Sequence, residues 1–177
     1  MIKKIIPLII ILLLSGCAVS HTYGPYTGTV VEKETGDPIN GAVVFLQFYT
    51  FGLFGISQYE DAVEVMTSQK GEFHVPPVRV ISRLPTLFSK WDPGQVIIFK
   101  PGYGAYPRHR EVSPRFRPSG TLPENQAVTI KLPKLTTREE RIDNAIGNLS
   151  LGSGVPPNKS ILFERLKKEE FDWLDGN

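Results

Sequence analysis

The sequence predicts a mainly β protein, an antiparallel β-sandwich of the seven-stranded type followed by a C-terminal helical hairpin. Three observations favour this fold. Short runs rich in β-branched residues alternate with glycine- and proline-containing turns across residues 26–133, and helix-capping signals follow in residues 134–177. The chain has 10 Phe, 6 Tyr and 2 Trp for a core but a single cysteine, so no internal disulfide can form and packing must stabilise the fold.

Five segments carry the strand pattern. They cover residues 27–32, 39–46, 71–75, 95–100 and 128–133. The 95–100 segment is a compact apolar run, typical of a strand buried on both faces, whereas 71–75 and 128–133 alternate as half-buried strands do. Pro133 ends the last strand, because proline has no amide hydrogen to donate to a neighbouring strand.

Two helices are expected in the 134–177 extension. Two overlapping capping boxes, Thr136 with Glu139 and Thr137 with Glu140, predict where the first helix begins. Apolar residues then follow at three- and four-residue spacings: Ile142, Ala145, Ile146 and Leu149. A second helix is expected at about 159–174. We expect the hairpin to cover one face of the sandwich; the alternative is an amphipathic helix that binds a partner.

The N-terminal residues have the pattern of an export signal that ends in a cysteine. Lys3 and Lys4 precede an apolar run at 5–14, which at ten residues is well short of the roughly 20 that span a bilayer. The run ends in Leu14-Ser15-Gly16-Cys17, which resembles the lipobox of bacterial lipoproteins. The resemblance implies that residues 1–16 are a signal peptide. The alternative is an ordinary secretory signal cut a few residues later, with the cysteine incidental.

The same resemblance implies a membrane partner and a location. Acyl chains on Cys17 contribute about 0.8 kcal/mol per buried methylene and hold a soluble domain at a membrane, with residues 17–25 as lipidated cysteine and tether. An aspartate after the cysteine commonly retains lipoproteins at the inner membrane of two-membrane bacteria, so Ala18 favours the outer membrane. Loss of residues 1–16 removes two of 20 basic residues and leaves 18 against 18 acidic ones. Nucleic acid is therefore not an expected partner.

Four sequence blocks carry a second resemblance. They are GTVV at 28–31, TGDPINGAVV at 35–44, TSQKGEF at 67–73 and KPGY at 100–103. In this order they resemble carboxypeptidase regulatory-like domains over about 26–133. The resemblance implies a prealbumin-like or transthyretin-like sandwich with a non-catalytic role in stability, adhesion or ligand contact. We expect no cofactor and no metal, because the three histidines are widely spaced and lack a paired HxxE pattern.

The candidate contact site for an anion or a partner is a basic segment with interleaved aromatic residues. It comprises Tyr103, Tyr106, Arg108, His109, Arg110 and Arg115. Arginine pairs bidentately with phosphate or carboxylate, so an anionic lipid, an anionic glycan or an acidic envelope protein is an expected ligand. A solvated loop is the alternative. The tyrosines and histidine also resemble part of the iron site of intradiol dioxygenases, but the second histidine of that site is missing.

An apolar, glycine-punctuated segment at 50–56 is the candidate apolar contact loop. Its bulky residues are Phe51, Leu53 and Phe54. We expect the loop to pack internally, under the C-terminal helices, because soluble domains rarely leave large apolar patches uncovered. The alternative is an exposed patch for a partner or for the bilayer surface.

Together these features predict a lipid-anchored, non-enzymatic protein of the cell envelope that acts as a structural or ligand- or protein-binding module. A small envelope hydrolase or metalloenzyme on a transthyretin-like scaffold is the alternative.

Overall fold

Nine strands and two α-helices form the parts of the chain that the computed structural model describes, residues 20–52, 57–82 and 90–176. The strands are β1 (Ser20–Tyr23), β2 (Tyr26–Glu32), β3 (Val43–Phe51), β4 (Ser57–Met66), β5 (Glu72–Val75), β6 (Val78–Ile81), β7 (Lys90–Trp91), β8 (Gln95–Phe99) and β9 (Ala127–Leu132). The helices are α2 (Arg138–Asn148) and α3 (Ile161–Gly176), with the short 3-10 helix η2 (Pro157–Lys159) before α3. The expected signal peptide at 1–16, Cys17 and Ala18 lie outside the described residues.

The strands form three sheets. In the four-stranded sheet β3 pairs with β4 along one edge and with β8 and β7 along the other. In the three-stranded sheet β2 lies between β5 and β9, and β1 pairs with β6 in a separate two-stranded sheet. All these pairs are antiparallel except β2 with β9, which is parallel. The expected mainly β chain with antiparallel sheets and C-terminal helices is confirmed; the parallel pair differs, because a long connection at 100–126 lets β9 return in the direction of β2.

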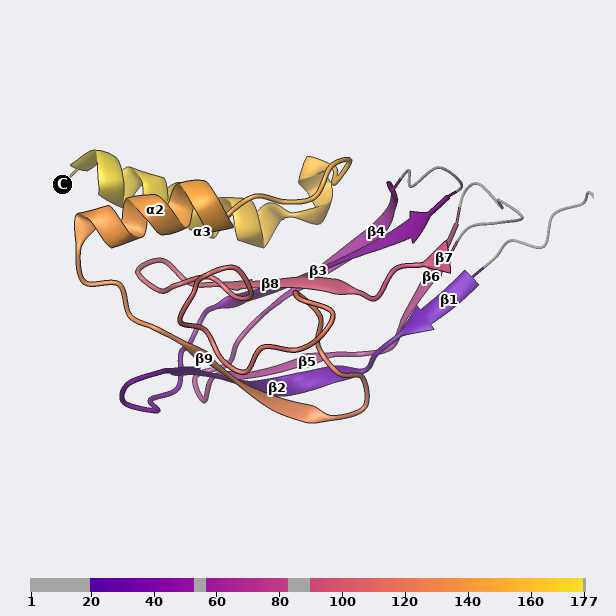
Figure 1. The fold of residues 1–177 in the computed structure, drawn as a ribbon, viewed down its shortest axis with the longest axis horizontal. Helices are drawn as coiled ribbons and strands as arrows, with labels where there is room; N and C mark the ends of the chain where they lie inside the picture. The colour runs from indigo at the N-terminus through magenta and orange to yellow at the C-terminus, as the bar shows by residue number, and fades with distance from the viewer. Residues whose placement is uncertain (1–19, 53–56, 83–89, 177) are drawn as a thin grey trace, which may run out of the picture.

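The main core lies between the four-stranded and three-stranded sheets, which face each other as two layers (Figure 1). Its buried side chains come from both layers. They include Val30, Phe73 and Ile130 of the three-stranded sheet and Val44, Leu46 and Ile98 of the four-stranded sheet. Burial of such side chains contributes about 1.5–3 kcal/mol each, so this layer of contacts stabilises the body of the protein.

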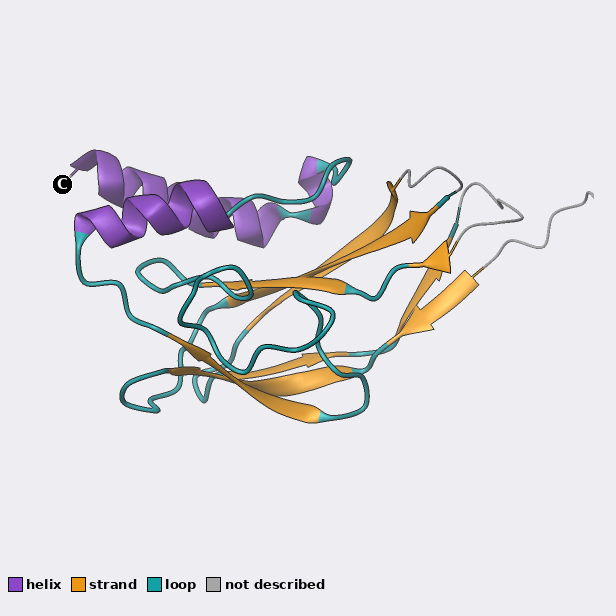
Figure 2. Cartoon of the chain, in the orientation of Figure 1, coloured by secondary structure: helices purple, strands orange, loops and turns teal. Residues whose placement is uncertain are grey.

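Figure 2 shows that α2 and α3 lie over the four-stranded sheet and away from the three-stranded one. Here the outward side chains of the strands form a second core with the helices. Its members include Val43, Phe45, Ile97 and Phe99 of the sheet and Ala145, Leu149, Phe163 and Leu166 of the helices. Alternate residues of β3 thus enter opposite cores, which explains why its apolar residues run without interruption.

Helix α2 begins where the capping box predicts. The Thr137 side chain accepts a hydrogen bond from the Glu140 amide, and the Glu140 carboxylate accepts one from the Thr137 amide in return. Ala145 and Leu149 face the sheet as expected. The expectation for Ile146 is wrong, because its side chain points away from the sheet and is 75% exposed.

Polar side chains of the sheet also bind the helical extension. The carboxylate of Glu64, on β4, accepts hydrogen bonds from the amides of Leu162 and Phe163 at 2.8 and 3.0 Å. These bonds satisfy two of the free donors in the first turn of α3. Asp61, also on β4, pairs with Lys159 at 2.7 Å. The extension is therefore fixed to the body by specific polar contacts as well as by apolar packing.

A buried ion pair joins the two helices to the turn after β8. The Glu170 carboxylate is fully buried and accepts hydrogen bonds from Arg141 Nε at 2.8 Å, from Arg141 Nη2 and from the Gly102 amide at 2.9 Å. The Arg141 guanidinium also lies over the Trp173 ring, 3.4 Å from its centroid. Three donors therefore compensate the buried negative charge of Glu170.

The last residues of the expected tether are part of the fold. Residues 20–23 form β1, and Tyr23 is buried against Phe48, with ring centroids 4.4 Å apart. The Tyr23 hydroxyl donates to the Asp92 carbonyl at 2.8 Å. The tether expectation is wrong for this part, because the strand is too short to show periodicity and only Tyr23 of its four residues is buried.

Replacing Glu170 tests the buried ion pair. Glu170→Ala leaves the Arg141 guanidinium and the Gly102 amide unpaired, so we expect the free energy of unfolding to fall by about 3–5 kcal/mol. Urea unfolding followed by circular dichroism measures the change. Glu169→Ala is the matched control, because Glu169 is next to Glu170 on the same helix but is exposed. Equal midpoints for the two variants would contradict the role given to Glu170.

Candidate functional site

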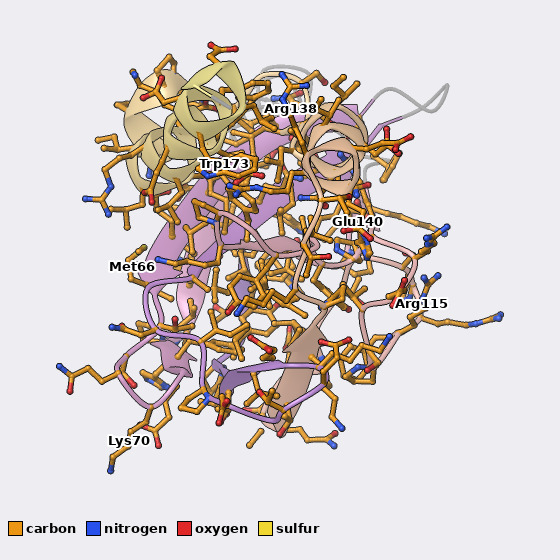
Figure 3. All side chains as sticks on the ribbon, turned by 90° about the vertical axis from the view of Figure 1, so that its left-hand side faces the viewer. Met66, Lys70, Arg115, Arg138, Glu140 and Trp173 are labelled. Atoms are coloured by element: carbon orange, nitrogen blue, oxygen red, sulfur yellow. The ribbon has the colours of Figure 1, made fainter. Side chains whose placement is uncertain are left out.

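A cleft of about 300 Å³ lies where the basic segment meets the helical extension. Its walls are the 108–111 loop, the chain that follows β9 and the exposed edge of α2. The lining side chains are Glu34, Arg108, His109, Arg110, Glu111, Pro133, Lys134, Leu135, Glu140, Asp143, Asn144 and Asn148. In Figure 3 the labelled Glu140 and Arg115 lie on the same side of the molecule. Arg108, His109 and Arg110, which the sequence analysis grouped, are therefore brought together in one hollow.

The cleft carries charges of both signs. Its acidic residues are Glu34, Glu111, Glu140 and Asp143, and its basic residues are Arg108, Arg110 and Lys134. The capping contacts of Glu140, with the amides of Thr137 and Thr136, lower the pKa of its carboxyl group. With four acidic and three basic side chains the cleft is not a site for anions alone, so it differs from the predominantly basic surface that the local sequence indicates.

Arg108 binds the end of α2. Its Nη1 atom donates to the Ser150 carbonyl at 3.1 Å and also to the Ser150 hydroxyl and the Asn148 carbonyl. Carbonyls at a helix C-terminus carry partial negative charge, and the last turn of α2 has no basic residue of its own. The guanidinium thus has a structural role between the loop and the helix.

Arg115 has a similar role within its own loop. Its Nη2 atom donates to the carbonyls of His109 and Arg110. Arg110 differs from both, because its side chain is 84% exposed and its charged contact is with Glu111, at 3.6 Å. Anion or partner binding by this segment stays a prediction, and these contacts make Arg110 the arginine best placed for it.

The His109 ring lies against the backbone. A Cβ atom on Gly104 would be 2.6 Å from His109 Cγ, so only glycine leaves room for the ring. Nδ1 of His109 accepts a hydrogen bond from the Glu111 amide at 3.3 Å, which places the hydrogen of the neutral ring on Nε2. Burial lowers the pKa of His109 from 6.5, so the imidazole is neutral at physiological pH.

Neither of the two tyrosines lines the cleft. Tyr106 is 1% exposed and its hydroxyl donates to the Thr121 carbonyl at 3.0 Å, so the expectation that it contacts a ligand is wrong. Tyr103 is half-buried and its hydroxyl donates to Glu32 Oε2 at 3.0 Å. Burial raises the pKa of each phenol to about 12, which disfavours the phenolate form that binds ferric iron. No group of three or more His, Cys, Asp and Glu side chains suited to a metal occurs among the described residues.

Asn144 is a cleft residue that the sequence analysis missed. It is buried, its Oδ1 atom accepts from the Ala105 amide at 2.9 Å, and its Nδ2 atom donates to the Tyr103 carbonyl at 3.2 Å. The amide thus pairs with the backbone of the segment that leads into the 108–111 loop. The sequence offered one signal for this role, a polar residue directly beside the apolar stripe of α2, and that signal alone is weak.

The apolar loop is described only in part. Phe51 ends β3, is 40% exposed and is absent from both cores. The expectation of internal packing under the helices is therefore wrong for Phe51. Leu53 and Phe54 lie outside the described residues.

Among the residues that the structure describes, neither helix has the length and apolar character needed to cross a bilayer.

Comparison with known proteins adds little to this geometry. No family model matches the chain, and no curated protein matches it either. A crystal structure of a 9R-lipoxygenase from Cyanothece PCC8801 matches 54% of this chain, with 16% sequence identity and a TM-score of 0.25. The match covers 14% of the lipoxygenase chain. A likeness at this level carries no argument about fold or function.

The buried environment of His109 predicts a pH-dependent stability. The unfolded chain binds a proton at the His109 side chain more readily than the folded protein does. The stabilisation is fully present above pH 6.5 and is lost as the pH falls through the lowered folded-state pKa. We expect urea midpoints to fall between pH 7.5 and 5.5 in the unmodified protein and to fall less in His109→Gln.

The matched control is His74→Gln, because His74 is exposed on β5. It should retain the full pH dependence. The lowered pKa values of Glu111 and Glu140 lie below 4.5 and so do not interfere in this range. The same slope in the His109 and His74 variants would rule out the assignment.

Proposed function

We propose that this chain is a lipid-anchored, non-enzymatic protein of the bacterial cell envelope that binds a partner through the mixed-charge cleft. The placement of β1 carries the proposal. β1 begins at Ser20, three residues after Cys17, and lies at the opposite end of the molecule from helix α2, which borders the cleft (Figure 1). Three residues span at most about 11 Å. A lipid on Cys17 would therefore hold the β1 end at the membrane and present the cleft away from it.

The proposed scaffold is a prealbumin-like sandwich of the carboxypeptidase regulatory-like kind. The two facing sheets support it, and so do glycines within the resembling blocks. Gly71 has φ +71° and a Cβ there would be 2.4 Å from the Val30 carbonyl oxygen. A Cβ on Gly28 would be 2.3 Å from the Val128 carbonyl oxygen, between two paired strands. The sequence pattern thus has glycine where the backbones approach too closely for any other residue.

The cleft favours a polar partner with charges of both signs, such as the surface of another envelope protein. Four carboxylates and three basic side chains would repel parts of a uniform polyanion, whereas a protein surface can match them in pattern. The hydrolase or metalloenzyme alternative finds less support here. The hydroxyls of Tyr103 and Tyr106 and the Nδ1 atom of His109 are engaged in hydrogen bonds within the fold.

Lipid attachment is tested on protein purified from the membranes of producing cells. We expect mass spectrometry to find acyl chains on Cys17 and loss of residues 1–16. Cys17→Ser should move the protein from the membrane fraction to the soluble fraction, because it removes the acyl chains and neither helix of the described residues could span a bilayer in their place. Ser20→Ala, three residues further on, is the control and should remain in the membrane fraction. A free thiol in the membrane-purified protein would overturn the proposal.

Partner binding is tested by crosslinking in intact envelopes. The double variant Arg110→Glu with Lys134→Glu reverses two exposed cleft charges, so we expect recovery of the crosslinked partner to fall about tenfold, as a loss of about 1.4 kcal/mol gives. The control is Arg165→Glu with Lys168→Glu, which reverses two exposed charges on α3 outside the cleft. Equal recovery from both double variants would exclude the cleft as the contact surface.

A further inference from the structure

We infer that the end of the molecule opposite the cleft is a bilayer-contact surface, on which exposed apolar and basic side chains rest against the lipid. This strand-end surface consists of His21, Phe51, Arg79, Ile81 and Lys90. The inference rests on the lipid anchor proposed above and goes beyond it. An anchor fixes one residue near the membrane, whereas a contact surface fixes the orientation of the whole body.

The five residues come from strands whose ends meet at one end of the fold (Figure 1). In the register of β1 with β6, Ser20 lies opposite Ile81. In the register of β3 with β7, Phe51 lies opposite Lys90. Trp91 joins the two pairs, since its ring stacks on His21 with centroids 5.6 Å apart while its backbone lies opposite Thr50.

The exposed chemistry suits the interface of a bilayer. Ile81 is 52% exposed and Phe51 is 40% exposed, although the other apolar residues of their strands are buried or, for Val78, half-buried. Two exposed basic residues accompany them: Lys90 lies opposite Phe51 in the register of β7 with β3, and Arg79 is two residues before Ile81 on β6. Apolar side chains that enter the acyl boundary, flanked by basic groups that meet anionic headgroups, are the combination that holds proteins on a membrane surface.

The length of the connecting chain selects the bilayer as the occupant. Ile81 lies directly opposite Ser20, and at most about 11 Å of chain separates Ser20 from Cys17. A lipid on Cys17 therefore brings the strand-end surface to the headgroups without any further movement. Such a short connection gives the contact a high effective concentration, so even a weak apolar contact is occupied. Ile146 is more exposed than Ile81, but it lies on α2 beside the cleft and lacks this proximity.

The two tryptophans of the chain provide the test, because they lie at opposite ends. Trp91 is on β7 at the strand-end surface, and Trp173 is near the end of α3. The lipidated protein is reconstituted in vesicles of phosphatidylethanolamine and phosphatidylglycerol whose acyl chains carry bromine, a short-range quencher of indole fluorescence. Trp173→Phe leaves only Trp91 emitting, and Trp91→Phe leaves only Trp173.

We expect bromine to reduce Trp91 emission by about half and to leave Trp173 emission unchanged, as contact at one end alone would give. If Trp91→Phe does not fold, the unmodified protein replaces it, and its quenching should be intermediate because both rings emit. Adding Phe51→Ser and Ile81→Ser to the Trp173→Phe protein should remove most of the quenching. Ile146→Ser in the same background is the matched control and should change nothing.

Flotation with the vesicles and mass spectrometry of Cys17 separate the two ways to fail. A protein that floats with an acylated Cys17 but shows no quenching of Trp91, or stronger quenching of Trp173, overturns the contact surface and leaves the anchor in place. Quenching that survives the serine double variant overturns the role of Phe51 and Ile81. A protein with a free Cys17 thiol that does not float overturns the anchor, and the inference falls with it.

Discussion

The buried carboxylate of Glu170 is the interaction on which the arrangement of the other parts depends. A charge removed from water costs several kcal/mol unless neighbouring groups compensate it, and here a forked guanidinium and a backbone amide do so. The three residues of this contact belong to three different segments: Glu170 to α3, Arg141 to α2 and Gly102 to the turn after β8. That turn leads directly into the backbone that Asn144 binds and then into the 108–111 loop. The geometry of the cleft thus depends on a contact that is not part of it.

Strand β3 has the corresponding role in the apolar part of the fold. Its alternate residues enter two cores, one shared with the opposite sheet and one shared with the helices. The helices therefore pack on β3, the same strand that contributes side chains to the main core. Because Glu64 and Asp61 hold the helical extension from β4, the next strand, apolar and polar contacts fix the same elements in place.

Short sequence patterns predicted those strands and helix ends that depend mainly on neighbouring residues. The segments corresponding to β2, β5, β8 and β9 were expected within a residue or two, and the start of α2 followed from its capping box. β4 was missed because its acidic residues hide the strand pattern. Two of these acidic residues, Asp61 and Glu64, have partners about a hundred positions further along the chain, and a sequence window cannot show such partners.

The candidate site was predictable to a similar extent. Arg108, His109 and Arg110 line the same cleft, since neighbours in a loop stay neighbours in space, but their role in binding stays a prediction. The inward orientation of Tyr106 was not predictable, because it depends on the Thr121 carbonyl and on the core beneath it. The backbone carbonyls that accept hydrogen bonds from Arg108 and Arg115 were not predictable either. Nor were the acidic residues of the cleft that come from the turn after β2 and from helix α2.

The cleft is formed by two parts of the chain that differ in composition, the β body and the helical extension. One wall comes from the loops of the β body, and the other comes from Glu140, Asp143, Asn144 and Asn148 of the helical extension. A fragment ending at Pro133 would lack one wall entirely and would uncover Phe45 and Phe99, which the extension keeps from water. The extension thus forms one wall of the cleft and also covers the apolar face of the four-stranded sheet. Its loss would remove that wall and expose a large apolar surface in the same step.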